Sequence, residues 1–201
     1  MNAPLNKGEL SRQVILRTAL EQARKIGLEG LTIGSLADVL QRSKSGVFAH
    51  FGSREDLQLA VLEEGARQFI DEVFVPALKE KRGLPRLRAL YRGWLKRMVD
   101  TKVGGCIFVE GAAEFGNGAG LVREKISELQ AQWRKQLAKT VELTVEASPK
   151  SKADPDQLAF ELFSLTLGVH HDARMFGAKD ALRRGEAAFE RLVQVHELSP
   201  K

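Results

Sequence analysis

The residues of this chain whose types and spacing suit a chemical task lie close together, between Arg42 and Arg54. The run Ser43-Lys44-Ser45-Gly46 supplies a hydroxyl, a cation and small residues in four consecutive positions. A hydroxyl at the first position caps a helix, and the small residues leave room for close approach to a duplex. The pattern predicts a helix whose N-terminal end meets phosphates and base edges in the major groove of DNA. The sequence leaves a plainer alternative open, in which Arg42 and Lys44 are solvated charges and His50 is a packing residue.

Three short helices are needed to position these residues. Apolar spacing predicts them over residues 11–26, 33–40 and 44–50, with a hydroxyl residue at each start. Ser11, Thr32 and Ser43 are the expected N-caps, and Gly27 is the expected stop of the first helix. The second and third helices form a helix-turn-helix candidate, which we expect to be held together by five apolar side chains: Leu36, Ala37, Leu40, Val47 and Phe51.

The rest of the chain is also predicted to be helical, because apolar residues recur at three- and four-residue spacings and do not alternate. Ser53 is expected to cap a long helix that Pro76 kinks or ends. The fold class is therefore all-α, with about nine helices. The later helices are expected from Pro85, over 106–115 between two glycine-rich turns, over 121–146, over 155–175 and over 178–197.

Composition narrows the classes of protein without identifying one. The chain has 201 residues and a single cysteine, Cys106, which excludes an internal disulfide and a multi-cysteine zinc site. Its net charge is +5, but residues 1–57 carry eight basic and six acidic residues, so the basic excess is not concentrated there. Placement of the cations, rather than their number, points to DNA. No signal peptide or membrane span is visible in the sequence, and we expect a cytoplasmic protein.

The stretch from Leu31 to Leu57 resembles the DNA-binding signature of the tetracycline-repressor (TetR) family. The resemblance covers roughly residues 12–62, and the remainder of the chain is similar to the family only in helix count and length. The matching elements are the threonine that opens the second helix, Leu36-Ala37, Ser43-Lys44-Ser45-Gly46, His50-Phe51 and the entry into the fourth helix, Gly52-Ser53-Arg54-Glu55-Asp56-Leu57.

This resemblance implies a homodimeric transcriptional regulator, usually a repressor, that binds a palindromic operator and is released by a small, mostly apolar effector. It divides the chain into a DNA-binding domain, 1–57, and a helical effector-binding and dimerisation domain, 58–201. It implies no enzyme activity, and we expect neither a cofactor nor a metal. By position, the residues that contact phosphates are Thr32, Ser43, Phe48, His50 and Arg54. Those that approach bases are Lys44, Ser45 and Gly46.

The sequence departs from the usual pattern of the family in two places, the turn and Phe48. Gln41-Arg42 replaces the common Gly-Val of the turn, so Gln41 is expected to take a strained φ, and Arg42 can add a phosphate or base contact. Phe48 replaces a common tyrosine, which removes a hydroxyl and leaves packing as an alternative role for this side chain.

The C-terminal helices offer candidates for an effector pocket and a dimer interface. For each single aromatic or methionine the sequence favours a core role over ligand contact, and for the polar residues it favours the surface or a dimer interface. Effector-pocket candidates are Trp94, Met98, Cys106, Glu110, Glu114, Phe115, Trp133, Phe163 and His170. Dimer-interface candidates, for which an intramolecular core is the alternative, are Leu158, Leu162, Leu165, Leu182, Phe189 and Leu192.

Two other classes of function compete with a repressor. A helical enzyme is disfavoured because the sequence contains no nucleophile elbow, phosphate-binding loop or metal-binding histidine motif. A helical adaptor that has lost DNA binding is the other, and Gln41 and Phe48 are its only support.

Overall fold

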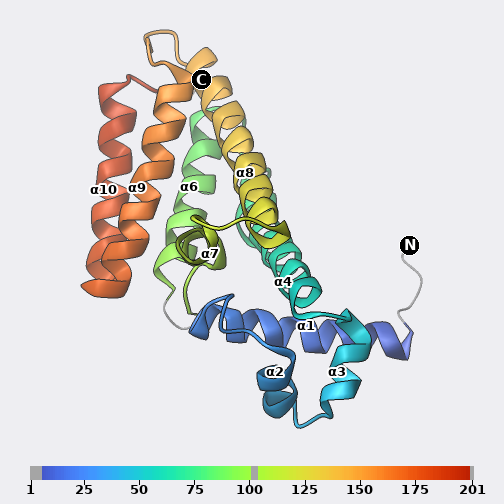
Figure 1. Ribbon diagram of the computed structural model, residues 1–201. Coiled ribbons are helices and arrows are strands. Elements are labelled where there is room, and N and C mark those ends of the chain that lie inside the picture. Colours follow the sequence, from blue (N-terminus) through green and yellow to red (C-terminus); the bar gives the residue numbers. More distant parts are fainter. Residues whose placement is uncertain (1–5, 101–103, 200–201) are drawn as a thin grey trace. The chain divides into compact units, whose positions relative to one another are not determined.

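The computed structural model describes residues 6–100 and 104–199, in which helices are joined by turns (Figure 1). Four helices come first: α1 (Lys7–Ile26), α2 (Ile33–Leu40), α3 (Lys44–Phe51) and α4 (Arg54–Phe69). α4 continues into a π-helical turn, η1 (Ile70–Phe74), and then into α5 (Val75–Ala77). The later helices are α6 (Leu84–Val99), α7 (Ile107–Phe115), α8 (Leu121–Glu146), α9 (Pro155–Met175) and α10 (Ala178–Val195).

The predicted all-α fold is confirmed. If α4, η1 and α5 are taken as one continuous run, the described residues form nine helices. Within these residues, no helix is both long enough and apolar enough to span a bilayer. The predicted bounds of α2, α8 and α9 agree with the structure, whereas α1 begins four residues earlier than predicted.

The early start of α1 has a local cause. The Asn6 side chain accepts a hydrogen bond from the Glu9 backbone N–H at 2.9 Å, and the Glu9 carboxylate accepts one from the Asn6 N–H at 2.8 Å. This reciprocal capping box satisfies backbone donors that the start of a helix otherwise leaves unpaired. Ser11, the expected N-cap, therefore lies inside α1.

Pro76 lies at the end of a widened helical run, as its sequence position predicts. A proline ring clashes with the carbonyl four residues before it in a regular α-helix and supplies no N–H. In the structure a π turn, η1, comes directly before Val75, and the run ends at Ala77. The wider turn and the early end are two ways of relieving the same conflict.

The chain divides into two compact units. One contains residues 1–67 and 103–128, and the other contains residues 68–102 and 129–201. The division predicted at residue 57 came from the family resemblance, and it does not coincide with the boundaries of these compact units. As a result, α7 belongs to the same unit as α1, α2 and α3, although it lies far from them in the sequence.

The core of the second unit is built from α6, α9 and α10, which pack on one another. Tyr91 is fully buried and its ring stacks on Phe189, with centroids 4.5 Å apart. The Tyr91 hydroxyl donates to the Leu162 carbonyl at 3.1 Å and accepts from Thr166 at 3.2 Å. Burial raises the pKa of this phenol, and the Thr166 hydrogen bond opposes part of that rise. These bonds satisfy the polar atoms that the core encloses.

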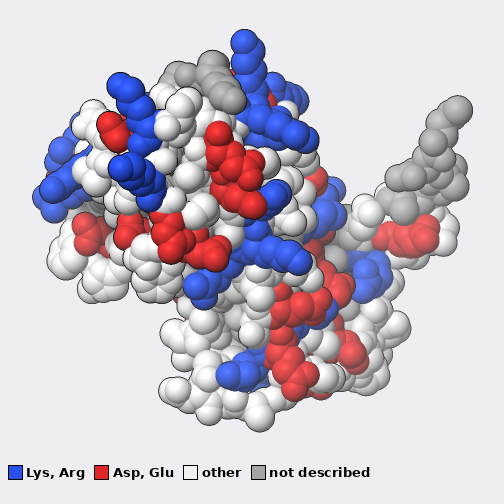
Figure 2. Space-filling view, turned by 90° about the horizontal axis from the view of Figure 1, so that it is seen from above, with Lys and Arg blue, Asp and Glu red and all other residues white. Residues whose placement is uncertain are grey.

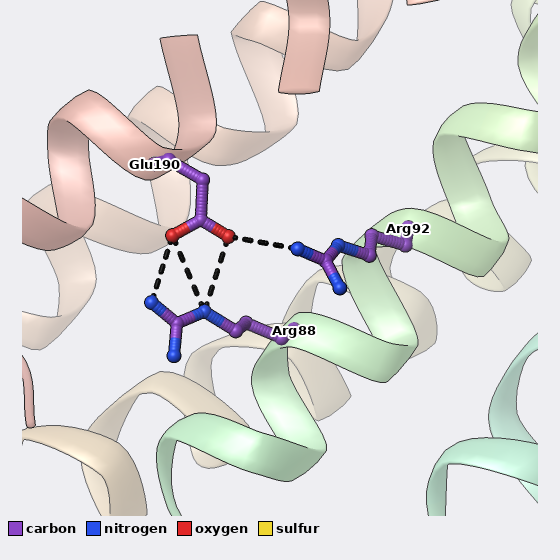
Figure 3. A network of polar contacts seen from close by, with 3 residues as sticks. All are labelled: Arg88, Arg92 and Glu190. Atoms are coloured by element: carbon purple, nitrogen blue, oxygen red, sulfur yellow. Dashed lines mark hydrogen bonds and ion pairs between the residues drawn. The ribbon is translucent and has the colours of Figure 1, made fainter. Parts of the chain in front are cut away.

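A carboxylate joins α10 to α6 at the edge of this core (Figure 3). Glu190 accepts hydrogen bonds from Arg88 at 2.8–3.2 Å and from Arg92 at 3.2 Å. The Arg88 contact involves both Nε and Nη2, which fixes the orientation of the pair as well as its distance. Hydrogen bonding to Arg88 lowers the pKa of Glu190.

Candidate nucleic-acid interface

The turn between α2 and α3 and the start of α3 form an exposed surface over a buried seam. Val47 and Phe51 on α3 are buried, as are Leu36 and Ala37 on α2. These are four of the five side chains predicted to hold the helix pair together, and the fifth, Leu40, is half-buried. On the other side, the exposed residues of the turn and of α3 are Gln41, Arg42, Ser43, Lys44, Ser45, Gly46, Phe48 and Ala49.

The start of each helix in this pair is capped by the hydroxyl that the sequence predicts. Ser43 Oγ accepts a hydrogen bond from the Gly46 N–H at 3.1 Å, and Ser45 Oγ donates to Ser43 Oγ at 3.3 Å. Thr32 Oγ1 accepts from the Ser35 N–H at 3.0 Å, and Ser35 Oγ accepts from the Thr32 N–H at 3.2 Å. The first N–H groups of a helix have no partner within it, so the exposed start of α3 is suited to binding an anion such as a phosphate.

The turn itself carries the backbone strain that its sequence predicts. Gln41 adopts φ 51° and ψ 43°, the left-handed conformation that favours glycine. Its N–H bonds to the Asp38 carbonyl at 3.2 Å, and the Arg42 N–H bonds to the Ala37 carbonyl at 3.0 Å. These bonds end α2 sharply and bring Ser43 into the position of the next cap.

Two cations lie beside the turn. Arg42 Nη1 donates to Ser11 Oγ on α1 at 2.6 Å, which holds its side chain toward α1. Lys44 lies next to Gly34, where an added Cβ would be 3.5 Å from Lys44 Cε and 3.7 Å from Nζ. Lys44 is the first residue of α3, and its ammonium group lies close to the first turn of α2. A positive charge between two helix starts adds to their attraction for a phosphate.

Arg54, which the resemblance places at a phosphate contact, also makes hydrogen bonds within the protein. Its Nε donates to the Leu31 carbonyl at 3.1 Å and its Nη2 donates to the Glu29 carbonyl. The guanidinium therefore braces the loop between α1 and α2. The sequence gives no signal of this, because the acceptors are backbone atoms more than twenty residues away.

Phe48 and His50 differ in how far they reach into solvent. Phe48 is 52% exposed, so packing, the alternative role left open by the sequence, does not account for its position. His50 is half-buried, with its ring edge-to-face against Phe51 at 6.4 Å between centroids. An exposed phenyl ring at this position offers an apolar surface rather than the hydroxyl of a tyrosine.

Charge on the molecular surface is mixed. Figure 2 shows one face, on which basic and acidic side chains occur in small adjacent groups. With a net charge of only +5, contact with DNA depends on where the individual cations lie.

Comparison with known proteins decides the family. Residues 83–189, more than half of the chain, match the family described as tetracyclin repressor-like, C-terminal domain. The chain belongs to the TetR family. This family consists of DNA-binding transcriptional regulators, and the match lies in the region where the sequence alone showed only helix count and length.

One curated relative and two solved structures illustrate the similarity. The repressor AcnR of Corynebacterium glutamicum is 36% identical over 70 residues, which are 35% of this chain and 37% of that repressor. The chain therefore matches little more than a third of the length of this relative. A TetR regulator from Chloroflexus aurantiacus has a TM-score of 0.85 at 20% identity, covering 97% of this chain and 100% of that one.

Another structure of similar fold was solved as a complex. AibR, crystallised with isovaleryl coenzyme A and operator DNA, has a TM-score of 0.71 at 18% identity. The similarity covers 88% of this chain and 96% of that one. At these identities the two structures show that the fold is shared.

The effector-pocket candidates of this TetR-family chain fall into both compact units. In the second unit, Trp133 lies edge-to-face with Trp94 at 5.0 Å, and Trp94 lies 5.8 Å from Phe163 between centroids. Phe69 and Phe74, which were not among the candidates, join this cluster at 4.5 and 6.4 Å from Trp133. Their helical spacing is shared with ordinary core residues, so no sequence signal distinguishes them.

One polar atom of this aromatic cluster is buried without a hydrogen-bond partner. Trp133 Nε1 is buried, and no described residue accepts a hydrogen bond from it. Met98 and His170 are buried in the same unit. Burial lowers the pKa of His170, and the charges of Arg174 and His171 act in the same direction. A buried imidazole that is neutral can donate one hydrogen bond and accept another.

The remaining candidates lie in the first unit, on and beside α7. Cys106 is the N-cap residue of α7, and Glu110 and Phe115 follow on that helix. The Glu114 carboxylate accepts hydrogen bonds from the backbone of Leu28 and Glu29, which the pocket prediction did not foresee. Over the described ranges, no three His, Cys, Asp or Glu side chains gather as metal ligands would.

The candidate dimer residues differ in how far they are buried within the second unit. Leu158, Leu162 and Phe189 are each 1% exposed, so their side chains are already covered within the second unit. Leu165, Leu182 and Leu192 are half-buried. The pattern of α9, apolar nearly all round, made its inner and outer faces indistinguishable in the sequence. Its exposed stripe consists of Phe160, Ser164, Leu167, His171, Arg174 and Met175.

Proposed function

We propose that this TetR-family chain is a repressor that binds a palindromic operator as a homodimer, through the α2-turn-α3 surface. The observation that carries the proposal is the exposure of Arg42, Ser43, Lys44 and Phe48 around the capped start of α3, opposite a buried seam. A capped helix start with adjacent cations provides phosphate contacts, and its small residues permit close approach to base edges. AcnR, with which the chain shares 36% identity over 70 residues, is named as a repressor.

The two half-sites of the operator are expected to lie about one helical turn apart, ~34–36 Å, because a two-fold dimer reads a palindrome. The surface that we assign to the dimer contact is the exposed stripe of α9. Phe160, Leu167 and Met175 lie on it at spacings of seven and eight residues, which place them on one helix face. Exposed apolar residues aligned in this way are typical of a protein–protein contact.

We assign effector binding to the aromatic cluster of the second unit. Trp94, Trp133 and Phe163 supply apolar surface, and the unpaired Trp133 Nε1 supplies one hydrogen-bond donor. A buried donor without a partner is costly, and a ligand with an acceptor atom relieves that cost. The expected effector is therefore small and mostly apolar, with a carbonyl or similar acceptor.

Operator binding is tested with DNA from the region flanking the gene of this protein. Fluorescence anisotropy gives the affinity of the wild type and of the double variant Arg42→Ala/Lys44→Ala. The double variant should bind at least tenfold more weakly, because it removes two cations from each reading surface. Lys96→Ala removes an exposed cation from α6 and serves as the matched control. Equal affinities of the double variant and the control would contradict the proposed interface.

Effector binding is tested through intrinsic fluorescence. The chain has two tryptophans, and both lie in the aromatic cluster, so the emission reports on this site alone. In a screen of small carbonyl compounds, one that changes the emission should also weaken operator binding. Trp133→Phe keeps an aromatic ring but removes the hydrogen-bond donor. It should lower the affinity for that compound at least tenfold. If the compound binds the variant as tightly as the wild type, the assignment of Trp133 is wrong.

A further inference from the structure

The loop between α1 and α2, residues 27–31, is held by a carboxylate from α7. The backbone N–H groups of Leu28 and Glu29 both donate to the same oxygen, Glu114 Oε2, each at 3.0 Å. A Cβ on Gly27 would overlap the other oxygen, Glu114 Oε1, and Gly27 also has a positive φ of 82°. Only glycine meets both conditions, because other residues carry a Cβ and rarely adopt this conformation. Gly27 thus leaves the space that the Glu114 carboxylate occupies at this loop.

The carbonyl groups of the same loop are bound from α4. Gln58 Nε2 is buried and donates to the Leu28 carbonyl at 2.8 Å. Arg54 donates to the carbonyls of Glu29 and Leu31. The loop is therefore bound through its N–H groups by α7 and through its carbonyls by α4. Thr32, the N-cap of α2, comes directly after it, so these bonds hold the segment that leads into the helix-turn-helix.

A second contact ties the start of α7 to the end of α1. The Gly105 N–H donates to the Arg24 carbonyl at 2.8 Å. A Cβ on Gly104 would overlap that carbonyl, and Gly104 also has a positive φ, 87°. The segment that carries α7 is thus docked on the last turn of α1 at one end and on the loop after α1 at the other.

We propose that Glu114 is a positioning residue for DNA binding: through Leu28 and Glu29, it fixes the orientation in which α2 and α3 meet the operator. The inference rests on the proposed DNA-binding role of α3 and does not require the proposed effector site. Hydrogen bonds weaken steeply with distance and angle, so a small displacement of α7 releases both N–H groups together. The position of α7 is then transmitted to the reading surface through one carboxylate.

The sign of the effect separates this role from simple electrostatics. Removing an acidic side chain from a DNA-binding unit ordinarily strengthens binding slightly, because it reduces repulsion of the phosphates. Loss of a positioning contact weakens binding instead. Glu114→Ala is therefore expected to lower operator affinity about tenfold, which corresponds to about 1.4 kcal/mol. Glu114→Gln keeps an oxygen that can accept both N–H groups, and it should stay within threefold of the wild type.

The experiment measures operator affinity by anisotropy, with the thermal midpoint of each variant recorded so that all are compared while fully folded. Glu124→Ala, at an exposed position on α8 in the same unit, is the matched control and should bind as the wild type does or slightly more tightly. Amide hydrogen exchange at Leu28 and Glu29 provides a direct readout, and it should accelerate in Glu114→Ala and not in Glu124→Ala. If Glu114→Ala proves unstable, Glu114→Asp keeps the charge but is one methylene too short, and should also weaken binding.

The outcomes are distinguishable. If the wild type binds its operator and a folded Glu114→Ala (or Glu114→Asp) binds equally well, the inference is overturned while the proposed function stands. Equal losses of operator affinity in Glu114→Ala and Glu114→Gln would also overturn the inference. The neutral acceptor oxygen of glutamine would then have failed to restore DNA binding. If the wild type shows no operator binding, the proposed function itself fails and the inference falls with it.

Discussion

Replacing Gln41 by glycine should stabilise the protein, because Gln41 holds a left-handed conformation at the turn of the helix-turn-helix. Its φ of 51° and ψ of 43° cost a residue with a Cβ roughly 1–2 kcal/mol. Glycine adopts this conformation without strain. However, glycine is more flexible in the unfolded chain, and this entropy lowers the free energy of unfolding by about 0.5–1 kcal/mol. The net gain in the free energy of unfolding should be about 0.5–1 kcal/mol. For a chain of this length, that raises the thermal midpoint by about 1–4 °C.

Thermal unfolding followed by circular dichroism measures this change. Gln41→Ala keeps a Cβ and therefore the strain, so its midpoint should stay within about 1 °C of the wild type. Glu197→Gly is a matched control in the other unit, since Glu197 follows α10 with φ 49°, and it should give a similar gain. The reasoning would be refuted if Gln41→Gly had no effect or lowered the midpoint while Glu197→Gly raised it. Operator affinity should change less than threefold, because Gln41 is not among the proposed DNA contacts.

Three further predictions concern the exposed and charged side chains. Phe48→Ala should weaken operator binding about five- to tenfold in anisotropy, whereas Phe48→Tyr, which restores a phosphate-binding hydroxyl, should strengthen it; equal binding by both variants would show that Phe48 lies outside the interface. Leu167→Glu should shift sedimentation toward monomer, and Leu167→Ala much less; an unchanged sedimentation profile would count against the α9 stripe. Glu190→Gln should lower the free energy of unfolding at pH 7 by about 0.5–1 kcal/mol, since the pair with Arg88 is one-third exposed. Arg88 lowers the folded-state pKa of Glu190. The stabilisation by this ion pair is therefore present above about pH 4.5 and is lost as the pH falls through the lowered pKa. In this pH range, the free energy of unfolding of Glu190→Gln, measured with denaturant, should change less with pH than that of the wild type.

Local signals in the sequence were sufficient for the helices. Hydroxyl caps at Thr32 and Ser43 and prolines at helix ends act over a few residues, so their positions can be read directly. α1 began earlier than predicted because the capping box of Asn6 and Glu9 was overlooked, although its spacing is visible. The strain at Gln41 was predicted from its place in the turn, which is also local information, and the positive φ in the structure confirms it.

Contacts between distant segments could not be predicted in this way. Glu114 binds the loop after α1 across more than eighty residues, and its partners are backbone donors that almost every residue carries. The internal hydrogen bonds of Arg54 were missed for the same reason, because its partners are carbonyl groups. Leu162 and Leu167 lie on opposite sides of α9, one buried and one exposed, in a segment whose apolar residues surround the helix. Which face turns inward depends on the packing of α6 and α10, and the sequence of α9 does not contain that information.

The salt dependence of operator binding tests the central claim most directly, namely that α3 and its flanking cations contact DNA. Each phosphate neutralised by a cation contributes about −0.9 to the slope of log affinity against log salt. Arg42→Ala/Lys44→Ala removes four cations from a dimer, so its slope should be shallower than that of the wild type by about 2 to 4. The slope of Lys96→Ala should equal that of the wild type. A double variant with an unchanged slope would contradict the account, because the cations at the start of α3 would then not touch the operator.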